Sequence, residues 1–293
     1  MSLIATLAEL RFRDPGRITL AWYNRTPGAL PAPGERLIVI AADHVARGVV
    51  GVGGEPLAMA NREDLLRRCL TALGRPGVHG FLGTPDLVED LLLLGALDGK
   101  LVYGTVNRAG LAGSAFEIDD RVTAYDPSSP RWRWWQDRLD GVKLLLRIDL
   151  ADPATPAALE RAARTVSKVA DDDAGQTVIV EPFLSTTRDG RQVNLLEPDA
   201  MITAIGIASA LGSTSAHTWL KVPCVADMDR VMASTTLPCL LLGGDVPVDQ
   251  EAQLKAWVAA LRLPNVMGMV VGRSVLYPRD GDVAAAVDRL VEA

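Results

Sequence analysis

Short apolar runs alternate with longer amphipathic segments along almost the whole chain. Eight runs rich in valine, isoleucine and leucine have the length and the flanking turn residues that are typical of buried strands. They lie at residues 36–42, 78–82, 101–104, 142–148, 177–183, 217–222, 237–242 and 267–271. Because most of these runs are apolar at nearly every position, they indicate strands that are covered on both faces, as in a parallel sheet.

Helix signals follow these runs. The clearest segment begins at Thr84, an N-cap residue, with Pro85 at the first helical position and leucines at helical spacing behind it. Similar segments lie at 61–73, 153–170, 197–211, 225–234, 248–261 and 282–291, with a weaker one inside 129–139. Eight repeating strand-then-helix units predict an α/β protein with the (β/α)8 TIM-barrel fold, and not an open doubly wound sheet.

Two regions fall outside the repeat. Residues 1–35 predict an N-terminal helix and linker that cover the bottom of the barrel, ahead of a catalytic barrel domain at 36–293. Residues 105–140 form an elaborated loop, in which the loose alternation of 115–125 predicts a small hairpin. Long loops on the side where strands end commonly shape access to a site.

Composition narrows the class of protein. A chain of 293 residues with 48% hydrophobic residues is long enough to bury a large core as one domain. Its net charge of −6 argues against nucleic acid or an anionic membrane as the main partner. No apolar run approaches the length of a membrane span, and the N-terminus does not resemble a signal peptide. With three cysteines at unrelated spacings, we expect a cytoplasmic protein.

Charged residues interrupt three of the apolar runs. Lys143, Glu181 and Lys221 occur at similar intervals along the chain, each within or at the end of a predicted strand. A charge in a covered strand is costly unless it is paired or takes part in chemistry. A lysine amine beside a second cation can attack a carbonyl and form a protonated Schiff base, and a carboxylate between the two lysines can move the protons. These residues therefore predict an enzyme active site.

Other candidate residues follow the first, seventh and eighth strands. Asp43 ends the first strand, and Gly243 and Gly244 follow the seventh. Gly272 and Arg273 follow the eighth, where TIM barrels often bind phosphate through backbone N–H groups and one guanidinium. This pattern predicts a small phosphorylated substrate.

Taken in order, several of these segments resemble the class I aldolases of the tagatose-bisphosphate and sulfofructose-phosphate aldolase group. The matching runs are 38–44, 142–145, 179–182, 220–224, 241–246 and 272–275. The resemblance implies a carbon–carbon lyase that reversibly cleaves a phosphorylated ketose or keto-sugar without metal or cofactor. Ketose bisphosphates, sulfosugar phosphates and the deoxy-keto-gluconate phosphate of inositol breakdown all stay open as substrates.

The resemblance also implies a role for each candidate residue. Lys221 would form the Schiff base, Glu181 would shuttle protons, Lys143 and Asp43 would orient and polarise the substrate, and Arg273 would bind phosphate. The pattern departs from the group after two strands. Pro223 and Cys224 stand where a glutamate is common in the group, and a Gly243-Gly244-Asp245 turn replaces a serine-glycine turn. The lysine that deoxyribose-phosphate aldolases carry on strand seven is missing from 237–245, which disfavours that activity.

Other interpretations stay open. His44, His79 and His217 would have to converge on one metal ion for a metal-dependent lyase or hydrolase, although no two share a metal-binding spacing and His79 has the position of a core residue. A sugar-phosphate-binding barrel without catalysis would keep the same fold. The glycine-rich segment 48–54 is interpreted as a loop over the pocket and not as a dinucleotide turn.

The oligomeric state is open. The tryptophan-rich segment 132–135 predicts an amphipathic helix whose indole rings pack on the barrel or on another subunit. Together with the apolar helix at 91–97, it is where subunits of a homo-oligomer would meet.

Overall fold

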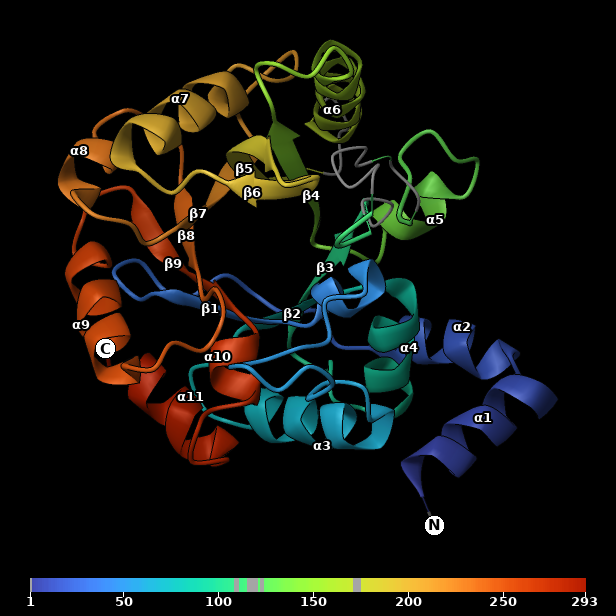
Figure 1. The fold of residues 1–293 in the computed structure, drawn as a ribbon. Helices are drawn as coiled ribbons and strands as arrows, with labels where there is room; N and C mark the ends of the chain where they lie inside the picture. The colour runs from blue at the N-terminus through green and yellow to red at the C-terminus, as the bar shows by residue number, and fades with distance from the viewer. Residues whose placement is uncertain (1, 108–110, 115–120, 122–123, 171–174) are drawn as a thin grey trace.

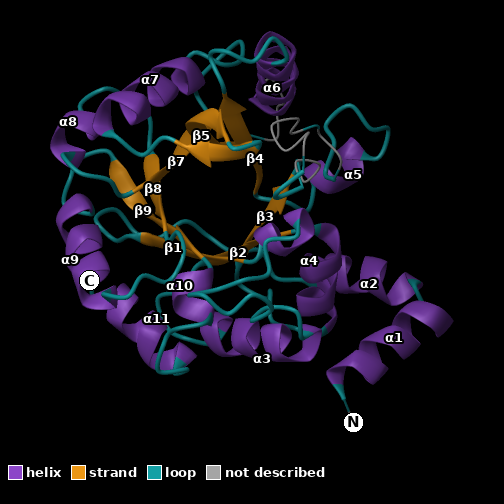
Figure 2. Ribbon diagram, in the orientation of Figure 1, coloured by secondary structure: helices purple, strands orange, loops and turns teal. Residues whose placement is uncertain are grey.

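Eight parallel strands close into a barrel in the computed structural model of the protein, which describes all residues except 1, 108–110, 115–120, 122–123 and 171–174 (Figures 1 and 2). Each strand pairs with its neighbours around the ring, with β9 on β1 and β4 on β5 closing the circle. The predicted (β/α)8 barrel is confirmed. The strands are β1 (Leu37–Ala41), β2 (Gly80–Gly83), β3 (Leu101–Thr105), β4 (Gly141–Ile148), β5 (Thr177–Arg188), β7 (Thr218–Pro223), β8 (Cys239–Leu242) and β9 (Val266–Val271).

Helices surround the strands, and each predicted helix is present with its ends shifted by a few residues. The largest difference is at 225–234, where only Met228–Met232 is helical. The outer helices are α3 (Arg62–Leu73), α4 (Pro85–Leu93), α5 (Trp132–Gln136), α6 (Thr155–Ala170), α7 (Pro198–Ser209), α8 (Met228–Met232), α9 (Gln250–Ala260) and α11 (Val283–Val291). Two short elements follow strands at the cavity: the 3-10 helix η1 (Asp43–Arg47) after β1 and α10 (Arg273–Leu276) after β9.

The inside of the barrel has an apolar layer with charges above it. Val39, Ile179 and Leu240 belong to one buried apolar cluster within the ring of strands. Lys143 is paired in register with Ile179, and Lys221 with Leu240, so both lysines share the inward face of those residues. Inward-facing charges thus lie toward the C-terminal ends of the strands, where TIM barrels place their chemistry.

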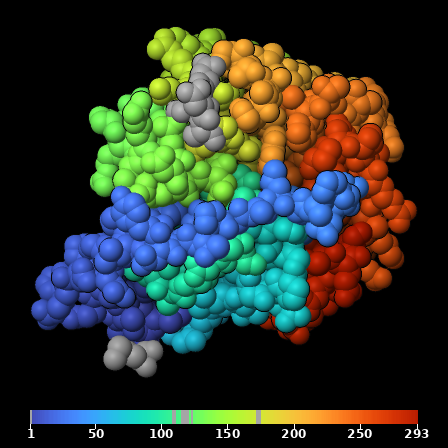
Figure 3. All heavy atoms as spheres, turned by 180° about the vertical axis from the view of Figure 1, so that it is seen from behind, coloured from blue at the N-terminus to red at the C-terminus, as the bar shows by residue number. Residues whose placement is uncertain are grey.

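The N-terminal region contains two helices, α1 (Leu3–Arg13) and α2 (Gly16–Asn24), which contact α3 and α4 on the outside of the barrel (Figure 1). Of the helix and linker expected at the barrel bottom, the helical part lies beside the barrel (Figure 1). The linker part lies at the N-terminal ends of the strands, where Pro27 bridges to Lys100 just before β3 and the Arg36 guanidinium donates to the carbonyl of Val266 at the start of β9. Figure 3 shows this N-terminal chain, in blue, lying across the back of the molecule.

The tryptophans of α5 pack inside the subunit, as one of the two interpretations predicted. The ring of Trp22 in α2 lies edge-on to the rings of Trp134 and Trp135, at centroid distances of 6.3 and 6.0 Å. Leu91 in the other expected subunit contact is fully buried in the core. Trp132 is buried as well, so both segments contribute to the core of the subunit itself. The hairpin predicted at 115–125 falls largely outside the described residues.

A hairpin that the sequence interpretation missed extends β5 beyond the barrel. β5 continues to Arg188 and pairs in antiparallel fashion with β6 (Arg191–Asn194). Asp189 and Gly190 form the turn with φ values of 49° and 72°, the left-handed region that two-residue hairpin turns require. The Asp-Gly pair between two strand-forming segments was the signal for this hairpin.

Within the described part of the chain, no helix combines the length and the apolar character needed to cross a membrane.

Barrel closure between β9 and β1 depends on Gly268. A Cβ atom at this position would lie 2.0 Å from the carbonyl oxygen of Leu37, so Gly268→Ala is expected to lower the free energy of unfolding by at least about 2 kcal/mol. Gly206 is the control, because it lies exposed within α7 and a Cβ there meets no atom within 4 Å. Gly206→Ala should raise stability by up to about 1 kcal/mol in urea unfolding. Equal effects of the two substitutions would contradict this account.

Candidate active site

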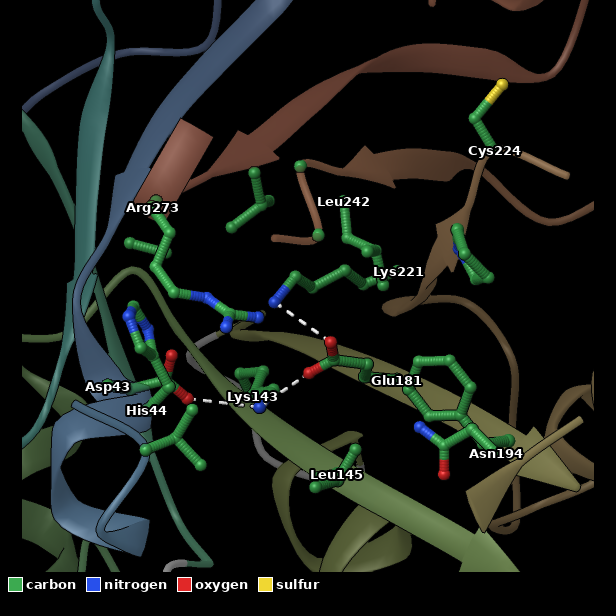
Figure 4. A pocket seen from close by; sticks show the side chains of 18 of the residues that line it. Asp43, His44, Lys143, Leu145, Glu181, Asn194, Lys221, Cys224, Leu242 and Arg273 are labelled. Carbon is green, nitrogen blue, oxygen red and sulfur yellow. Dashed lines mark hydrogen bonds and ion pairs between the residues drawn. The ribbon is translucent and has the colours of Figure 1, made fainter. Parts of the chain in front are cut away.

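A cavity of about 560 Å³ opens at the C-terminal ends of the strands. Its wall brings together every site residue that the sequence predicted, although they come from six different strands or the turns after them (Figure 4). These residues are Asp43, Lys143, Glu181, Lys221, Gly243, Gly244, Gly272 and Arg273.

Glu181 lies between the two lysines. Its Oε1 is 3.1 Å from the Nζ of Lys221, and its Oε2 is 2.6 Å from the Nζ of Lys143 (Figure 4, dashed lines). Lys143 also donates to Oδ2 of Asp43 at 3.0 Å. All four side chains are at most 10% exposed, so little water screens these contacts. The result is a buried chain of alternating charges that ends at the amine of Lys221.

The four buried charges stabilise one another. Burial alone would lower the pKa of Lys143, but the carboxylates of Asp43 and Glu181 outweigh it and raise that pKa. Burial would likewise raise the pKa values of both carboxyl groups, yet Lys143 and Lys221 hold them below their usual range. Lys143 is therefore a fixed cation, and Glu181 is an ionised carboxylate beside the second amine.

The Arg273 guanidinium faces the cavity from the start of α10. Its NH1 is 3.4 Å from Oδ1 of Asp245, which also accepts from the backbone N–H of Gly53 at 3.3 Å. The loop predicted to cover the pocket is thus hydrogen-bonded to the turn after β8. Gly272 allows the close approach of β9 to β1, because a Cβ there would lie 2.4 Å from the carbonyl oxygen of Ala41.

The three histidines do not form a common site, which removes the metal-dependent alternative that used them. His44 follows β1 and lines the cavity, where burial lowers its pKa to about 4. His79 precedes β2, and its Nδ1 accepts from the N–H of Ile38 near the opposite end of the barrel. His217 precedes β7 at that same end. In the described ranges, no group of three potential ligand side chains is arranged for a metal ion.

Several residues of the cavity wall were not predicted as site residues. Arg47 at the end of η1 is buried and donates to the carbonyl of Asn107 at 2.9 Å. No local pattern distinguishes it from an ordinary helical arginine. Asn194 reaches the cavity from the β5–β6 hairpin, whose Asp-Gly turn was the available signal. His44 was weighed only as a metal ligand.

A family model described as Cgl0159-like matches residues 35–291. The chain belongs to this family. The crystal structure of Cgl0159 from Corynebacterium glutamicum (Brevibacterium flavum) aligns with a TM-score of 0.92 and 45% sequence identity, over 99% of this chain and 96% of that chain. Curated proteins give no match.

More distant structures include class I aldolases. A Schiff-base-forming fructose-1,6-bisphosphate aldolase aligns with a TM-score of 0.63 at 19% identity, over 94% of this chain and 98% of that chain. An archaeal fructose-1,6-bisphosphate aldolase was solved with its catalytic lysine bound to the carbinolamine intermediate of the substrate. It aligns with a TM-score of 0.62 at 19% identity, over 94% of this chain and 99% of that chain. At this identity the likeness shows a shared fold.

Lys143→Met is expected to lower the free energy of unfolding at neutral pH by about 3–5 kcal/mol, because Asp43 and Glu181 would lose the cation that they share. Both carboxyl groups have lowered pKa values in the folded wild type, so their contribution is present above about pH 4 and is lost as pH falls. The difference in the free energy of unfolding between wild type and variant should therefore become smaller as the pH falls below about 4. Urea unfolding at neutral and acidic pH measures this difference.

Lys255→Met is the matched control for this substitution. Lys255 pairs with Glu251 on the surface of α9, where both side chains are more than three-quarters exposed, at 77% and 80%. Its removal should change stability by less than about 1 kcal/mol, with little dependence on pH. A Lys143→Met protein as stable as this control at neutral pH would contradict the buried-charge account.

Proposed function

We propose that this protein is a class I aldolase, in which Lys221 forms a Schiff base with a phosphorylated ketose or keto-sugar. One observation carries the proposal: in the cavity, the amine of Lys221 contacts a buried carboxylate whose other oxygen is held by a fixed ammonium group. A nucleophilic amine with an adjacent proton carrier is what imine chemistry requires. Membership of the tagatose-bisphosphate and sulfofructose-phosphate aldolase group is part of the proposal.

Imine formation begins when Lys221 gives a proton to Glu181 and its nitrogen attacks the ketone carbon. The carbonyl oxygen becomes the hydroxyl of a carbinolamine. Glu181 then returns a proton to this hydroxyl, which leaves as water, and a protonated imine remains on Lys221. The distance of 3.1 Å from Oε1 of Glu181 to the amine supports these transfers. The ammonium group of Lys143 and its partner Asp43 hold the carboxylate in position.

Cleavage uses the imine as an electron sink. Glu181 takes the proton from the hydroxyl on the carbon beyond the bond that breaks. The electron pair of that carbon–carbon bond moves toward the iminium nitrogen, so an enamine forms on Lys221 and an aldehyde departs. Protonation of the enamine carbon and addition of water then release the ketone and restore the lysine.

The substrate phosphate is assigned to Arg273 and the glycine turns after β8 and β9. The guanidinium is largely buried, at 22% exposure, and it is a planar donor suited to a phosphate group. Gly244 has a φ of 67°, a left-handed conformation that glycine adopts without strain. A cytoplasmic location also belongs to this proposal, and the free thiols of all three cysteines support it.

Borohydride reduction in the presence of phosphorylated ketoses tests the nucleophile. We expect a stable adduct on Lys221, identified by mass spectrometry of peptides, with a ketose bisphosphate, a sulfosugar phosphate and a phosphorylated keto acid as the panel. Lys221→Met should form no adduct and lose all turnover. Glu181→Gln keeps the amine, so it should still form some adduct while turnover falls by about 100-fold or more.

The outcomes separate the candidate functions. An adduct on another lysine, or full turnover in Lys221→Met, would end the proposal. Tight binding of a sugar phosphate with no adduct from any member of the panel would favour a barrel that binds without catalysis.

Arg273→Ala should raise KM for the phosphorylated substrate by about 10-fold to 100-fold with a smaller effect on kcat, because it removes a charge-assisted contact to a group that does not react. Arg289→Ala is the control, since Arg289 is half-exposed on α11 and pairs with Asp280. Steady-state kinetics measures both. A loss confined to kcat, with KM unchanged, would contradict a phosphate-binding role.

A further inference from the structure

Asn194 enters the cavity wall from outside the barrel. It ends β6, directly across from Ser185 of β5 in the hairpin register. Side chains alternate along a strand, so Ser185 points to the same side as Glu181 and Phe183, both of which line the cavity. Paired residues of neighbouring strands share a face, and Asn194 is thereby directed toward the same space.

Asn194 is exposed, and a hydrogen bond from the paired serine orients its amide. The Ser185 hydroxyl is buried and donates to Oδ1 of Asn194 at 2.9 Å. With its oxygen held by Ser185, the amide turns its nitrogen toward the cavity, on the side where Glu181 lies (Figure 4). An amide nitrogen carries two N–H donors, which can bind an oxygen atom of a ligand.

Asn194 and Arg273 stand on different sides of the proposed nucleophile. Arg273 follows β9, Asn194 belongs to the hairpin that continues β5, and β7 and β8 lie between them in the ring. Figure 4 shows Lys221 and Glu181 between the two side chains. A substrate with its phosphate at Arg273 and its carbonyl carbon at Lys221 therefore extends its other end toward Asn194.

We infer that Asn194 is a specificity-determining residue that donates a hydrogen bond to an oxygen on the aldehyde half of the substrate. This inference rests on the proposed function and adds the class of aldehyde that the enzyme takes. Aldehydes with a hydroxyl or other oxygen beyond the carbonyl are selected over aliphatic aldehydes of the same length. A site built to bond a polar group discriminates against a ligand that lacks it.

The test runs in the direction of condensation, with dihydroxyacetone phosphate as the fixed ketone and either glyceraldehyde or propanal as the aldehyde. Asn194→Asp keeps the shape and the oxygen that accepts from Ser185, but it removes the N–H donors. We expect the ratio of kcat/KM for glyceraldehyde to kcat/KM for propanal to fall at least about tenfold in this variant. Asn194→Ala should reduce the ratio in the same way, which guards against an effect of the added charge.

Gln192→Ala is the control on the same strand, because Nε2 of Gln192 bonds Thr187 within the hairpin and Gln192 does not line the cavity. It should leave the ratio unchanged. Equal losses for both aldehydes in Asn194→Asp, or no change in the ratio, would overturn the inference while trapping on Lys221 still succeeds. Failure of wild-type trapping would overturn the proposed function together with this inference.

Discussion

The buried ammonium group of Lys143, shared by two carboxylates, is the interaction on which the rest of the site depends. Two ionised carboxyl groups inside a barrel would repel each other and lose their hydration, and one cation at 3.0 and 2.6 Å from their oxygens offsets both costs. Glu181 is thereby kept ionised and fixed in place. Its second oxygen then meets the amine of Lys221, the group with the chemistry of a nucleophile.

The barrel provides this arrangement through strand register. Lys143 pairs with Ile179, and Lys221 pairs with Leu240, so the charged residues share the face of an apolar layer. Glycines stand where neighbouring backbones approach most closely. Gly268, for example, lies directly against the backbone of Leu37. A tightly packed lower layer limits the freedom of the side chains above it, which favours a preorganised site.

Sequence reasoning reached the barrel and the central residues for a physical reason. Charges inside apolar strands are rare and costly, so Lys143, Glu181 and Lys221 stood out without any structure. The sequence also indicated that Glu181 lies between the two lysines. It did not indicate that Lys143 pairs with Asp43, because that contact is made across the barrel between residues far apart in the chain. Asn194 was missed because the strand that contains Glu181 was predicted to end at residue 183, although the Asp189-Gly190 turn indicated a hairpin beyond it. Subunit contacts were expected at two apolar segments, in which Leu91 and Trp132 are buried in the core of this chain.

The packing of Trp22 against the tryptophans of α5 joins the N-terminal helix α2 to the segment between β3 and β4. The family model begins at residue 35, beyond both helices. A chain shortened to residues 35–291 would leave the indole rings of α5 facing water on one side. The N-terminal helices therefore support α5, and deleting them would loosen the packing of a helix that is distant in sequence.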